Sequence, residues 1–260
     1  NKIWNAANFL FINDCKFDSK LNTSLVQHSL NQWIINELSL TSQLVEKYIS
    51  KYLFHEVANV MYHFIWHTYC DWYIEFAKIH FQNLSKEAKE TKKVAIWVFV
   101  QILKMAHPIM PFITERLWSF INKDKCFLMN ELFTKLQIIN QFNASQINIK
   151  NLIQIISAVR NFRSELNIPY KESIDINFSN NDIHFMKFLH SYENELKRLL
   201  KFNKISFDNK TDKIAGVAYL VVEKTTLTIP LKNIVDTKKE IEKLQIKKQK
   251  EINIFNKLDN

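Results

Sequence analysis

Apolar residues recur every three or four positions through the first 122 residues of this 260-residue chain. That spacing places them along one side of an α-helix, so it predicts a run of helices and not a sheet. The pattern stops at Pro108 and resumes at Pro111, because proline lacks a backbone N–H and its ring blocks the preceding helical turn. We expect five helical segments with short connections, which is typical of an antiparallel bundle.

Candidate capping residues set the starts of two of these helices. Thr23 and Ser24 precede the second segment and Ser85 precedes the fourth, and their hydroxyl groups suit the N-cap position. The third segment carries apolar residues on most sides of its axis, which predicts that it is the central helix. After the first helix we expect helices over residues 23–51, 54–81, 85–106 and 111–122.

The pattern changes after residue 122. Residues 123–147 are polar and rich in asparagine, which predicts a linker between the helical domain of residues 1–122 and a second domain. Apolar and polar residues then alternate from Ile174 to Phe178, as in a half-buried strand. Residues 217–222 and 227–231 predict two more strands, with a hairpin turn between them. With helices over 149–166 and 181–201, residues 148–231 predict a small α+β domain.

Residues 232–260 are rich in lysine and glutamate and carry an incomplete apolar seam. The seam skips at Lys248, where an apolar residue would continue it. This pattern predicts one helix of an antiparallel coiled-coil arm. Asn1 lies inside an amphipathic pattern and the last residues lie inside a helical one, so we expect a piece of a longer protein. The whole chain is therefore predicted to be mainly α, with one small α+β domain.

The composition excludes several kinds of active site. Gly216 is the only glycine, so phosphate-binding glycine loops and nucleophile elbows are excluded. Three widely separated cysteines predict neither a disulfide framework nor a paired metal site. No apolar run approaches the length of a membrane span, and we expect a cytoplasmic protein without membrane contact. The formal net charge of +9 favours a polyanionic partner, although a compositional bias towards lysine explains it equally well.

Four motifs resemble one family. They are NKIWNAANF at residue 1, FIWHTYCDWYIE at residue 64, HPIMPFITERLW at residue 107 and VRNFRSELNI at residue 159. Together they resemble the C-terminal part of bacterial-type valyl-tRNA synthetases, which belong to class I of the aminoacyl-tRNA synthetases. The resemblance implies an anticodon-binding bundle, a small α+β domain and a coiled-coil arm that reaches the tRNA elbow. It implies tRNA(Val) as the partner of a monomeric chain.

The chain lacks the ATP-binding motifs of class I synthetases, so no catalytic residue and no cofactor are expected in it. The resemblance implies that ATP, Mg²⁺ and an editing domain belong to the intact enzyme. The alternatives are the same region of an isoleucyl- or leucyl-tRNA synthetase, or a helical adaptor for other proteins. The CDWYIE segment and the terminal arm favour the valyl enzyme.

The resemblance places the anticodon contact on the first helix, where the family shows a motif like KLWNAARF. Phe9 takes the place of its final aromatic residue, and Asn8 departs from the family's arginine. In the CDWYIE segment an acid and two aromatic residues either border the groove for unstacked bases or belong to the core. The predicted anticodon-binding residues are Lys2, Trp4, Asn5, Asn8, Phe9, Asp71, Trp72 and Tyr73.

Two arginines and a lysine-rich helix are candidates for contacts with the tRNA backbone. Arg160 and Arg163 lie one turn apart, and either they bind phosphate or they pair with Glu165 or Glu172. The lysines of the arm either contact the tRNA elbow or are simply solvated. They are Lys238, Lys239, Lys243, Lys247, Lys248 and Lys250.

His63 and His67 lie four residues apart, with Cys70 and Asp71 one turn further on. Such spacing can present two imidazoles to one metal ion. No glutamate completes an HExxH motif, and the rest of the segment is aromatic. We therefore interpret these residues as one polar face of a helix and expect no metal site.

Overall fold

A computed structural model describes residues 1–19, 21–82, 85–123, 126–132, 136–208 and 216–231, together with residues 245, 248, 249 and 252. The chain forms two compact units, Asn1–Lys150 and Asn151–Asn260. The boundary falls inside the helix that the sequence predicts over residues 149–166.

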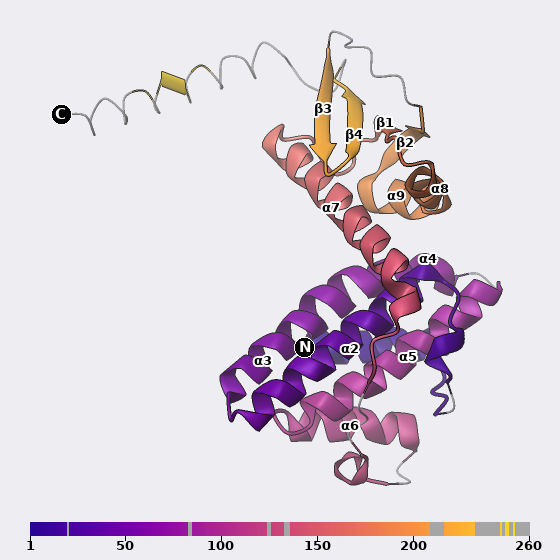
Figure 1. Ribbon diagram of the computed structural model, residues 1–260, viewed down its shortest axis with the longest axis vertical. Coiled ribbons are helices and arrows are strands. Elements are labelled where there is room, and N and C mark those ends of the chain that lie inside the picture. Colours follow the sequence, from indigo (N-terminus) through magenta and orange to yellow (C-terminus); the bar gives the residue numbers. More distant parts are fainter. Residues whose placement is uncertain are drawn as a thin grey trace. The chain divides into compact units, whose positions relative to one another are not determined.

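The first unit is a helical bundle, as the periodicity predicts. Helices far apart in sequence lie side by side in it, with α2 packed against both α3 and α5 (Figure 1). The helices are α1 Lys2–Ile12, α2 Ser29–Ser50, α3 Phe54–His63, η2 Phe64–Tyr73, α4 Ile74–Phe81, α5 Lys86–Ala106 and α6 Pro111–Asn122.

The central helix of this bundle is α5. Every residue from Val94 to Leu103 is buried, so α5 is covered on all sides. The expectation that the third segment is central was wrong, because that segment leaves Phe54 and Tyr62 largely exposed. A helix needs apolar residues all round to occupy the centre, and α5 meets that condition along almost three turns.

Local capping explains where the helices begin. Ser85 Oγ accepts a hydrogen bond from the N–H of Ala88, so the predicted cap of α5 is confirmed. For α2 the predicted cap was wrong: Thr23 and Ser24 belong to the short 3₁₀ turn η1, Thr23–Leu25. The Glu90 carboxylate of α5 accepts from the N–H groups of Gln27 and His28, immediately before α2 begins. A carboxylate distant in sequence thus holds the backbone just before α2, where a local cap was expected.

The third predicted helix is continuous from α3 to α4, but its middle is a π-helix. Residues Phe64–Tyr73, named η2, have the wider i→i+5 turn. A π-helical stretch of this length is uncommon, and such stretches occur often at functional sites. This one carries most of the FIWHTYCDWYIE motif.

Residues after α6 pack against the bundle where the sequence predicts a linker. Asn36 of α2 both donates to the carbonyl of Ile139, at 3.1 Å, and accepts from its N–H, at 3.0 Å. The short turns η3 Leu128–Asn130 and η4 Asn140–Phe142 bury Leu128 and Phe142. The described residues of this segment are therefore held in place by the helices.

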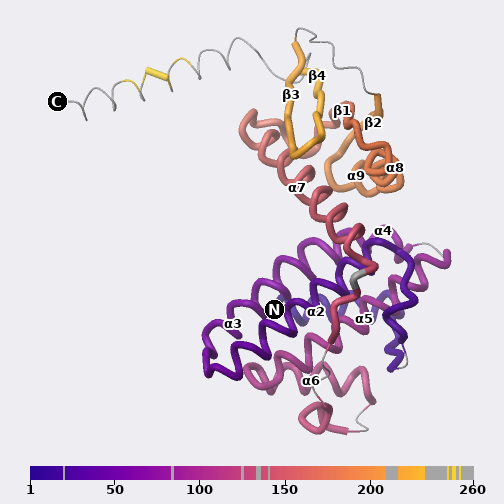
Figure 2. Tube along the Cα trace, in the orientation of Figure 1, coloured from indigo at the N-terminus to yellow at the C-terminus, as the bar shows by residue number. Residues whose placement is uncertain are grey.

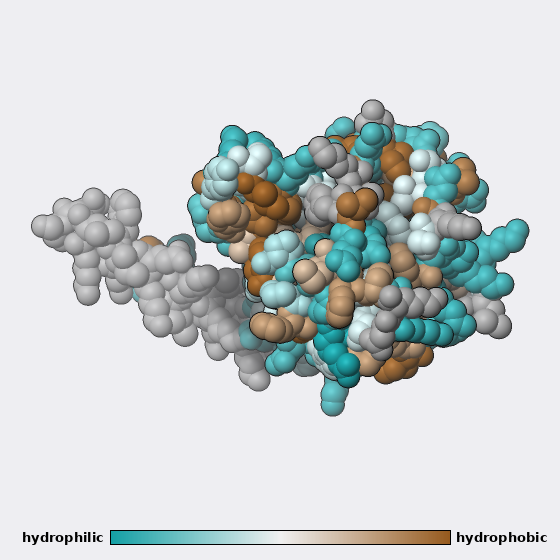
Figure 3. Space-filling view, turned by 90° about the horizontal axis from the view of Figure 1, so that it is seen from below, coloured by the Kyte–Doolittle hydropathy of each residue, from teal (hydrophilic) through white to brown (hydrophobic). Residues whose placement is uncertain are grey.

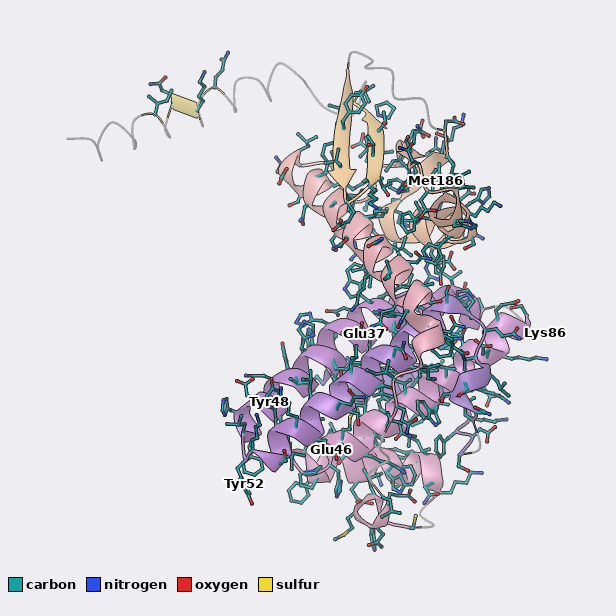
Figure 4. All side chains as sticks on the ribbon, in the orientation of Figure 1. Glu37, Glu46, Tyr48, Tyr52, Lys86 and Met186 are labelled. Atoms are coloured by element: carbon teal, nitrogen blue, oxygen red, sulfur yellow. The ribbon has the colours of Figure 1, made fainter. Side chains whose placement is uncertain are left out.

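The first turns of α7, Asn143–Glu165, also attach to α2. The carboxylate of Glu37, a residue that Figure 4 labels, accepts from Gln146 Nε2 at 2.8 Å and lies 2.9 Å from Lys150 Nζ. The helix itself was predicted, but it begins at Asn143, six residues earlier than its apolar pattern indicates. Polar contacts, which periodicity does not register, stabilise this extension.

The second unit contains the small α+β fold that the alternation predicts. Among the described residues of this unit, four strands lie in the order β2-β1-β4-β3, with β1 parallel to β2 and antiparallel to β4. Figure 2 shows the two short helices beside the sheet. The elements are β1 Ile174–Ser179, α8 Ile183–Ser191, α9 Glu193–Leu200, β2 Phe202–Ser206, β3 Val217–Val222 and β4 Thr225–Pro230.

Two features of this unit differ from the prediction. The helix expected over residues 181–201 is divided at Tyr192, which separates α8 from α9. Strand β2 was not predicted. The hairpin between β3 and β4 is confirmed, and its turn consists of Glu223 and Lys224.

The predicted coiled-coil arm lies largely outside the described residues. Gln245, Lys248, Gln249 and Ile252 are helical and exposed. The arm therefore stays a prediction. Among the described residues, no helix combines the length and apolar character required to cross a membrane.

Candidate nucleic-acid interface

A groove of about 360 Å³ runs between α1 and the segment η2–α4 in the first unit. We call it the α1–η2 groove. It lies between the NKIWNAANF motif at the start of the chain and the FIWHTYCDWYIE motif, which begins about sixty residues later. Its lining residues are Asn1, Lys2, Asn5, Ala6, Phe9, Trp66, Cys70, Ile74, Glu75 and Lys78.

The helical repeat of α1 directs three of the predicted anticodon residues to this groove. Lys2, Asn5 and Phe9 are spaced by three and four residues, so they share one side of the helix. The buried residues of α1, which include Ile3 and Leu10, lie next to that side of the helix, and α1 contacts η2. The positions of these three side chains in the groove are compatible with the predicted anticodon contact, which stays a prediction.

The opposite wall depends on the π-helix. Trp66, Cys70, Ile74 and Lys78 follow one another at intervals of four residues. In an ordinary α-helix such a series drifts by about 40° at each step, because four residues exceed one 3.6-residue turn. The wider π turn reduces this drift over η2. The aromatic, apolar and cationic members of the wall therefore face the same groove.

Two aromatic rings border the groove and retain accessible surface. Phe9 is half-buried and stacks on Phe81 of α4, with ring centroids 5.4 Å apart and an interplanar angle of 18°. Trp66 is 38% exposed and stacks on Tyr62, which is 56% exposed, with centroids 5.4 Å apart. Packing on one side holds each ring in place, which makes it suitable as a stacking platform for a planar ligand.

Lysine side chains lie close to both rings. Lys2 Nζ lies 4.3 Å from the centroid of the Trp66 ring, and Lys78 Nζ lies 5.7 Å from that of Phe9. Each lysine also has a carboxylate partner, Asp71 for Lys2 and Glu75 for Lys78. The groove thus combines aromatic surface with paired, partly exposed cations.

Asp71 does not line the groove but positions Lys2. Its Oδ1 accepts from Lys2 Nζ, and its Oδ2 lies 3.3 Å from His67 Nδ1. Its carboxylate is therefore shared by a lysine and a histidine, and its contact with RNA stays a prediction. Among the described residues, no group of three histidine, cysteine, aspartate or glutamate side chains could hold a metal ion.

Besides Asp71, four predicted anticodon residues do not line the groove. Trp4 and Asn8 are exposed on α1 but do not line it, and Trp4 meets Phe120 of α6 edge to face at 6.2 Å. Trp72 is half-buried and stacks on Phe76. The contact of these three residues with RNA stays a prediction.

The fourth of these residues, Tyr73, is a correction. Its side chain is 0% exposed, and its hydroxyl group donates to Asn31 Oδ1 at 2.9 Å. Burial and nearby charges hold the pKa of this phenol well above its ordinary value. A ring enclosed on all sides cannot stack on a base, so the predicted RNA contact of Tyr73 was wrong. The contact with Asn31 instead joins η2 to α2.

Burial also affects Cys70 in the wall of the groove. Desolvation raises the pKa of its thiol to about 11, although nearby Lys2 lowers it. The thiol is therefore neutral near pH 7 and behaves as a small apolar group. Cys70 therefore contributes apolar surface to the groove and no charge.

Sequence reasoning missed Trp66 and Lys78 as groove residues, and Tyr62 as the ring on which Trp66 stacks. Trp66 lies inside the FIWHTYCDWYIE motif, and its spacing from Cys70 was visible in the sequence. The signal that was missing is the π-helical turn, which decides the side to which Trp66 points. Tyr62 follows from Trp66, because it lies four residues earlier on the same face.

Of the predicted backbone-binding residues in the second unit, Arg163 is also a correction. Its side chain is only 5% exposed, and its guanidinium donates to the carbonyl oxygens of Leu200, Pro169 and Glu172. These hydrogen bonds occupy the guanidinium group and stabilise the fold, so the predicted phosphate contact of Arg163 was wrong. Arg160, three residues earlier, is exposed.

The predicted lysines of the arm lie outside the described residues, except one. Lys248 is helical and exposed. The others are Lys238, Lys239, Lys243, Lys247 and Lys250, and their role stays a prediction.

A second hollow in the first unit, of about 930 Å³, has a different character. It lies between α6 and η3, and Phe112, Phe127 and Met129 line it with large exposed apolar surfaces. Figure 3 shows apolar patches among hydrophilic ones on one face of the molecule. Arg116 is the one lysine or arginine among the described residues that line this hollow, whereas two lysine ammonium groups lie beside the rings of the α1–η2 groove, which therefore fits a nucleic acid better.

The chain is similar to known proteins over almost its whole length. Residues 31–178 match the family described as "Anticodon-binding domain of tRNA ligase". The valine–tRNA ligase of Buchnera aphidicola subsp. Acyrthosiphon pisum is 34% identical over 98% of this chain and 27% of its own length. That of Pelagibacter ubique is 34% identical over 97% of the chain and 29% of its own length.

A third relative, the valine–tRNA ligase of Bartonella henselae, is 33% identical over 92% of this chain and 26% of its own length. The chain thus spans between about a quarter and three tenths of the length of these relatives. The family match extends over more than half of the 260 residues and includes the whole of η2. The chain therefore belongs to the family of anticodon-binding domains of tRNA ligases.

Proposed function

We propose that this chain is the tRNA-binding part of a valine–tRNA ligase and that its α1–η2 groove receives bases of the anticodon loop. The family match and the names of the three relatives support the assignment to such a ligase. The observation that carries the proposal for the groove is the pair of packed aromatic rings, Phe9 and Trp66, each with a lysine ammonium group nearby.

Anticodon bases are unpaired, so a protein can stack on their faces and bind their edges. Phe9 and Trp66 supply stacking surfaces at the two walls of the groove. Asn5 of α1 also lines the groove, and its amide both donates and accepts, as the edge of a base requires. Base selection in this proposal comes from Asn5 and the shape of the groove, because stacking alone tolerates every base.

The two lysines bind phosphate in this proposal. Lys2 and Lys78 are paired with carboxylates in the free protein, so they exchange a surface ion pair for a phosphate contact. Such exposed pairs contribute only about 0–1 kcal/mol, so the exchange costs little. Asp71 and Glu75 keep the lysines at the groove until RNA arrives.

The remaining contacts in this proposal orient the tRNA without reading its sequence. Arg160 and the lysines of the arm bind backbone phosphates. The partner is tRNA(Val), and the chain acts as a monomer. Valine is attached to the tRNA, with ATP and Mg²⁺, by other parts of the ligase, and this chain supplies binding energy and orientation for that step of protein synthesis.

An isoleucyl- or leucyl-tRNA synthetase is the alternative nearest to this one. It is not favoured, because the three relatives are named for valine. A helical adaptor for other proteins is not favoured either, because the family that matches residues 31–178 is one of anticodon-binding domains.

The test is a binding titration of the chain with three RNAs. They are a tRNA(Val) transcript, the same transcript with abasic anticodon nucleotides, and a transcript with the isoleucine anticodon. We expect both altered transcripts to bind at least tenfold more weakly, because each base–aromatic stack contributes about 1–3 kcal/mol. Equal affinity for all three would contradict anticodon recognition. Preference for the isoleucine anticodon would support the alternative.

A further inference from the structure

The second unit contains a pocket that the proposed anticodon site does not use. Its volume is about 340 Å³, and we call it the Tyr170 pocket. All of its lining residues belong to α7, α9 and the turn that follows α7. They are Arg160, Arg163, Ser164, Ile168, Tyr170, Leu199 and Leu200.

Arg163 holds the frame of this pocket together. Its guanidinium donates to the carbonyl of Pro169 at 2.8 Å, to that of Leu200 at 3.2 Å and to that of Glu172. These three carbonyls lie on the turn after α7 and at the end of α9. One buried side chain therefore fixes the two backbone segments that carry Tyr170 and Lys201.

Tyr170 is an exposed aromatic residue on this fixed turn. Its side chain is 60% exposed, and the turn is closed by a hydrogen bond from the N–H of Glu172 to the carbonyl of Pro169 at 3.0 Å. Lys201 Nζ lies 5.8 Å from the centroid of its ring. An exposed aromatic ring on a fixed turn, with a cation beside it, has the two elements of a single-stranded nucleic-acid contact.

The charges around the pocket favour an anion. Arg160 and Lys201 are exposed, and the buried guanidinium of Arg163 adds a third positive charge beneath them. Glu172 lies close enough to Arg163 to attract it, and Glu165 is exposed at the end of α7. Among the described residues, two guanidinium groups and no carboxylate line the pocket, and the Lys201 ammonium group lies beside the Tyr170 ring, so the local charge is positive.

The size of the pocket limits what it accommodates. About 340 Å³ lies at the lower end of the range for small-ligand sites, so the pocket accepts one planar group and not a helix of a partner protein. We propose that it binds one unpaired tRNA nucleotide outside the anticodon, with the base on Tyr170 and the phosphate between Lys201 and Arg160. This inference rests on the proposed function, because it takes tRNA as the ligand.

The test compares two RNAs and four variants of the whole chain. The RNAs are an intact tRNA(Val) transcript and its isolated anticodon stem-loop. Tyr170→Ala removes the stacking surface, and Tyr170→Phe retains the ring. Lys201→Gln removes one cation, and Tyr219→Ala, in β3 of the same unit, is the control for loss of an exposed tyrosine.

We expect Tyr170→Ala to weaken binding of the intact tRNA by about five-fold or more, and to change binding of the stem-loop by less than two-fold. Tyr170→Phe and Tyr219→Ala should bind both RNAs like the unaltered chain. Lys201→Gln should reduce the slope of log affinity against log salt by about 0.7–0.9 for the intact tRNA only. Photocrosslinking with a 4-thiouridine-substituted tRNA should give an adduct at Tyr170, which tests the site even if the alanine variant unfolds.

Three other outcomes would contradict this inference, and one of them would also contradict the proposed function. Unchanged tRNA affinity of Tyr170→Ala, with no adduct at Tyr170, overturns the second site and leaves the anticodon proposal intact. Equal losses for the tRNA and the stem-loop also overturn it, because the nucleotide would then belong to the anticodon arm. If the unaltered chain binds neither RNA, both this inference and the proposed function are overturned.

Discussion

Lys2, in the first turn of α1, donates a hydrogen bond to the carboxylate of Asp71, in the last turn of η2. The two residues are 69 positions apart, and their contact joins the two motifs that form the α1–η2 groove. The same ammonium group lies over the ring of Trp66. Lys2 is therefore positioned by both a carboxylate and an aromatic face.

This arrangement predicts a salt-dependent role for Lys2. Lys2→Gln should weaken tRNA binding and reduce the slope of log affinity against log salt by about 0.7–0.9, because one phosphate contact is lost. Its effect on the free energy of unfolding should stay below about 1 kcal/mol, since the pair is partly exposed. Lys47→Gln, on the exposed surface of α2, is the matched control. An unchanged slope for Lys2→Gln would show that this lysine only holds α1 to η2.

Phe9 provides a second prediction, because it has both a structural contact and a proposed RNA contact. Phe9→Ala removes its stack on Phe81, and it also removes one wall of the groove. We expect a loss of about 1–3 kcal/mol in binding of tRNA(Val), and a smaller loss for the transcript with an abasic anticodon. Fluorescence titration of the two transcripts measures both values.

Phe11 is the matched control for Phe9. It lies on the same helix and is half-buried, but its ring faces Phe120 and not the groove. Phe11→Ala should lower stability without an anticodon-dependent loss of affinity. If both variants lose affinity equally for both transcripts, Phe9 is a packing residue only.

Tyr73 gives a third prediction, which separates core from groove within one motif. Tyr73→Phe should lower the free energy of unfolding by about 1–2 kcal/mol, because Asn31 Oδ1 then loses a hydrogen-bond donor inside the core. Its tRNA affinity should stay within two-fold of that of the unaltered chain. Urea denaturation and the same titration give the two values, and a loss of affinity without a loss of stability would restore Tyr73 to the interface.

Much of the helical fold was predictable because its signals are local. Ser85 caps α5 through its own hydroxyl group, and Pro111 starts α6 at the position where a missing N–H does no harm. Strand β2 was not predictable in this way. Phe202 and Ile205 are separated by two polar residues, and they become a strand only by pairing with Ile174 and Ile176 of β1.

The candidate site was predictable only in part, and for a related reason. The spacing of Lys2, Asn5 and Phe9 on a regular helix gives their common side. No such rule gives the side of Trp66, because η2 departs from the 3.6-residue repeat. Arg160 and Arg163 are equivalent by spacing, yet one is exposed and the other is buried beneath three carbonyls. That difference arises from the position of α9, about 35 residues away.

The cysteines lead to a fourth prediction, about reactivity and pH. Burial raises the pKa of Cys15 to about 12 and that of Cys70 to about 11, from an ordinary value of 9.0. Only Cys126 is exposed among the three. At pH 8 a disulfide reagent should therefore modify one thiol rapidly in the native chain and all three in denaturant.

The same pKa shifts determine how stability changes with pH. Above pH 9 the unfolded chain loses its thiol protons while the folded chain retains those of Cys15 and Cys70. The unfolded state then binds fewer protons, so the free energy of unfolding should fall as the pH rises from about 9 to 11. A Cys15→Ala, Cys70→Ala variant should show a smaller decrease over that range. Rapid modification of all three thiols in the native chain would contradict the burial of Cys15 and Cys70.

Arg163 gives the last prediction, and the tryptophans make it measurable. Arg163→Met removes the donors to three carbonyls and should destabilise the second unit by about 3–5 kcal/mol. All six tryptophans lie at or before Trp118, in the first unit, whereas far-ultraviolet circular dichroism reports on both units. We expect the dichroism transition to move to lower denaturant and the fluorescence transition to move less.

Arg160→Met, at an exposed position, should change stability by less than about 1 kcal/mol. If Arg163→Met instead leaves both transitions in place and lowers tRNA affinity, the Arg163 guanidinium binds phosphate and does not stabilise the fold.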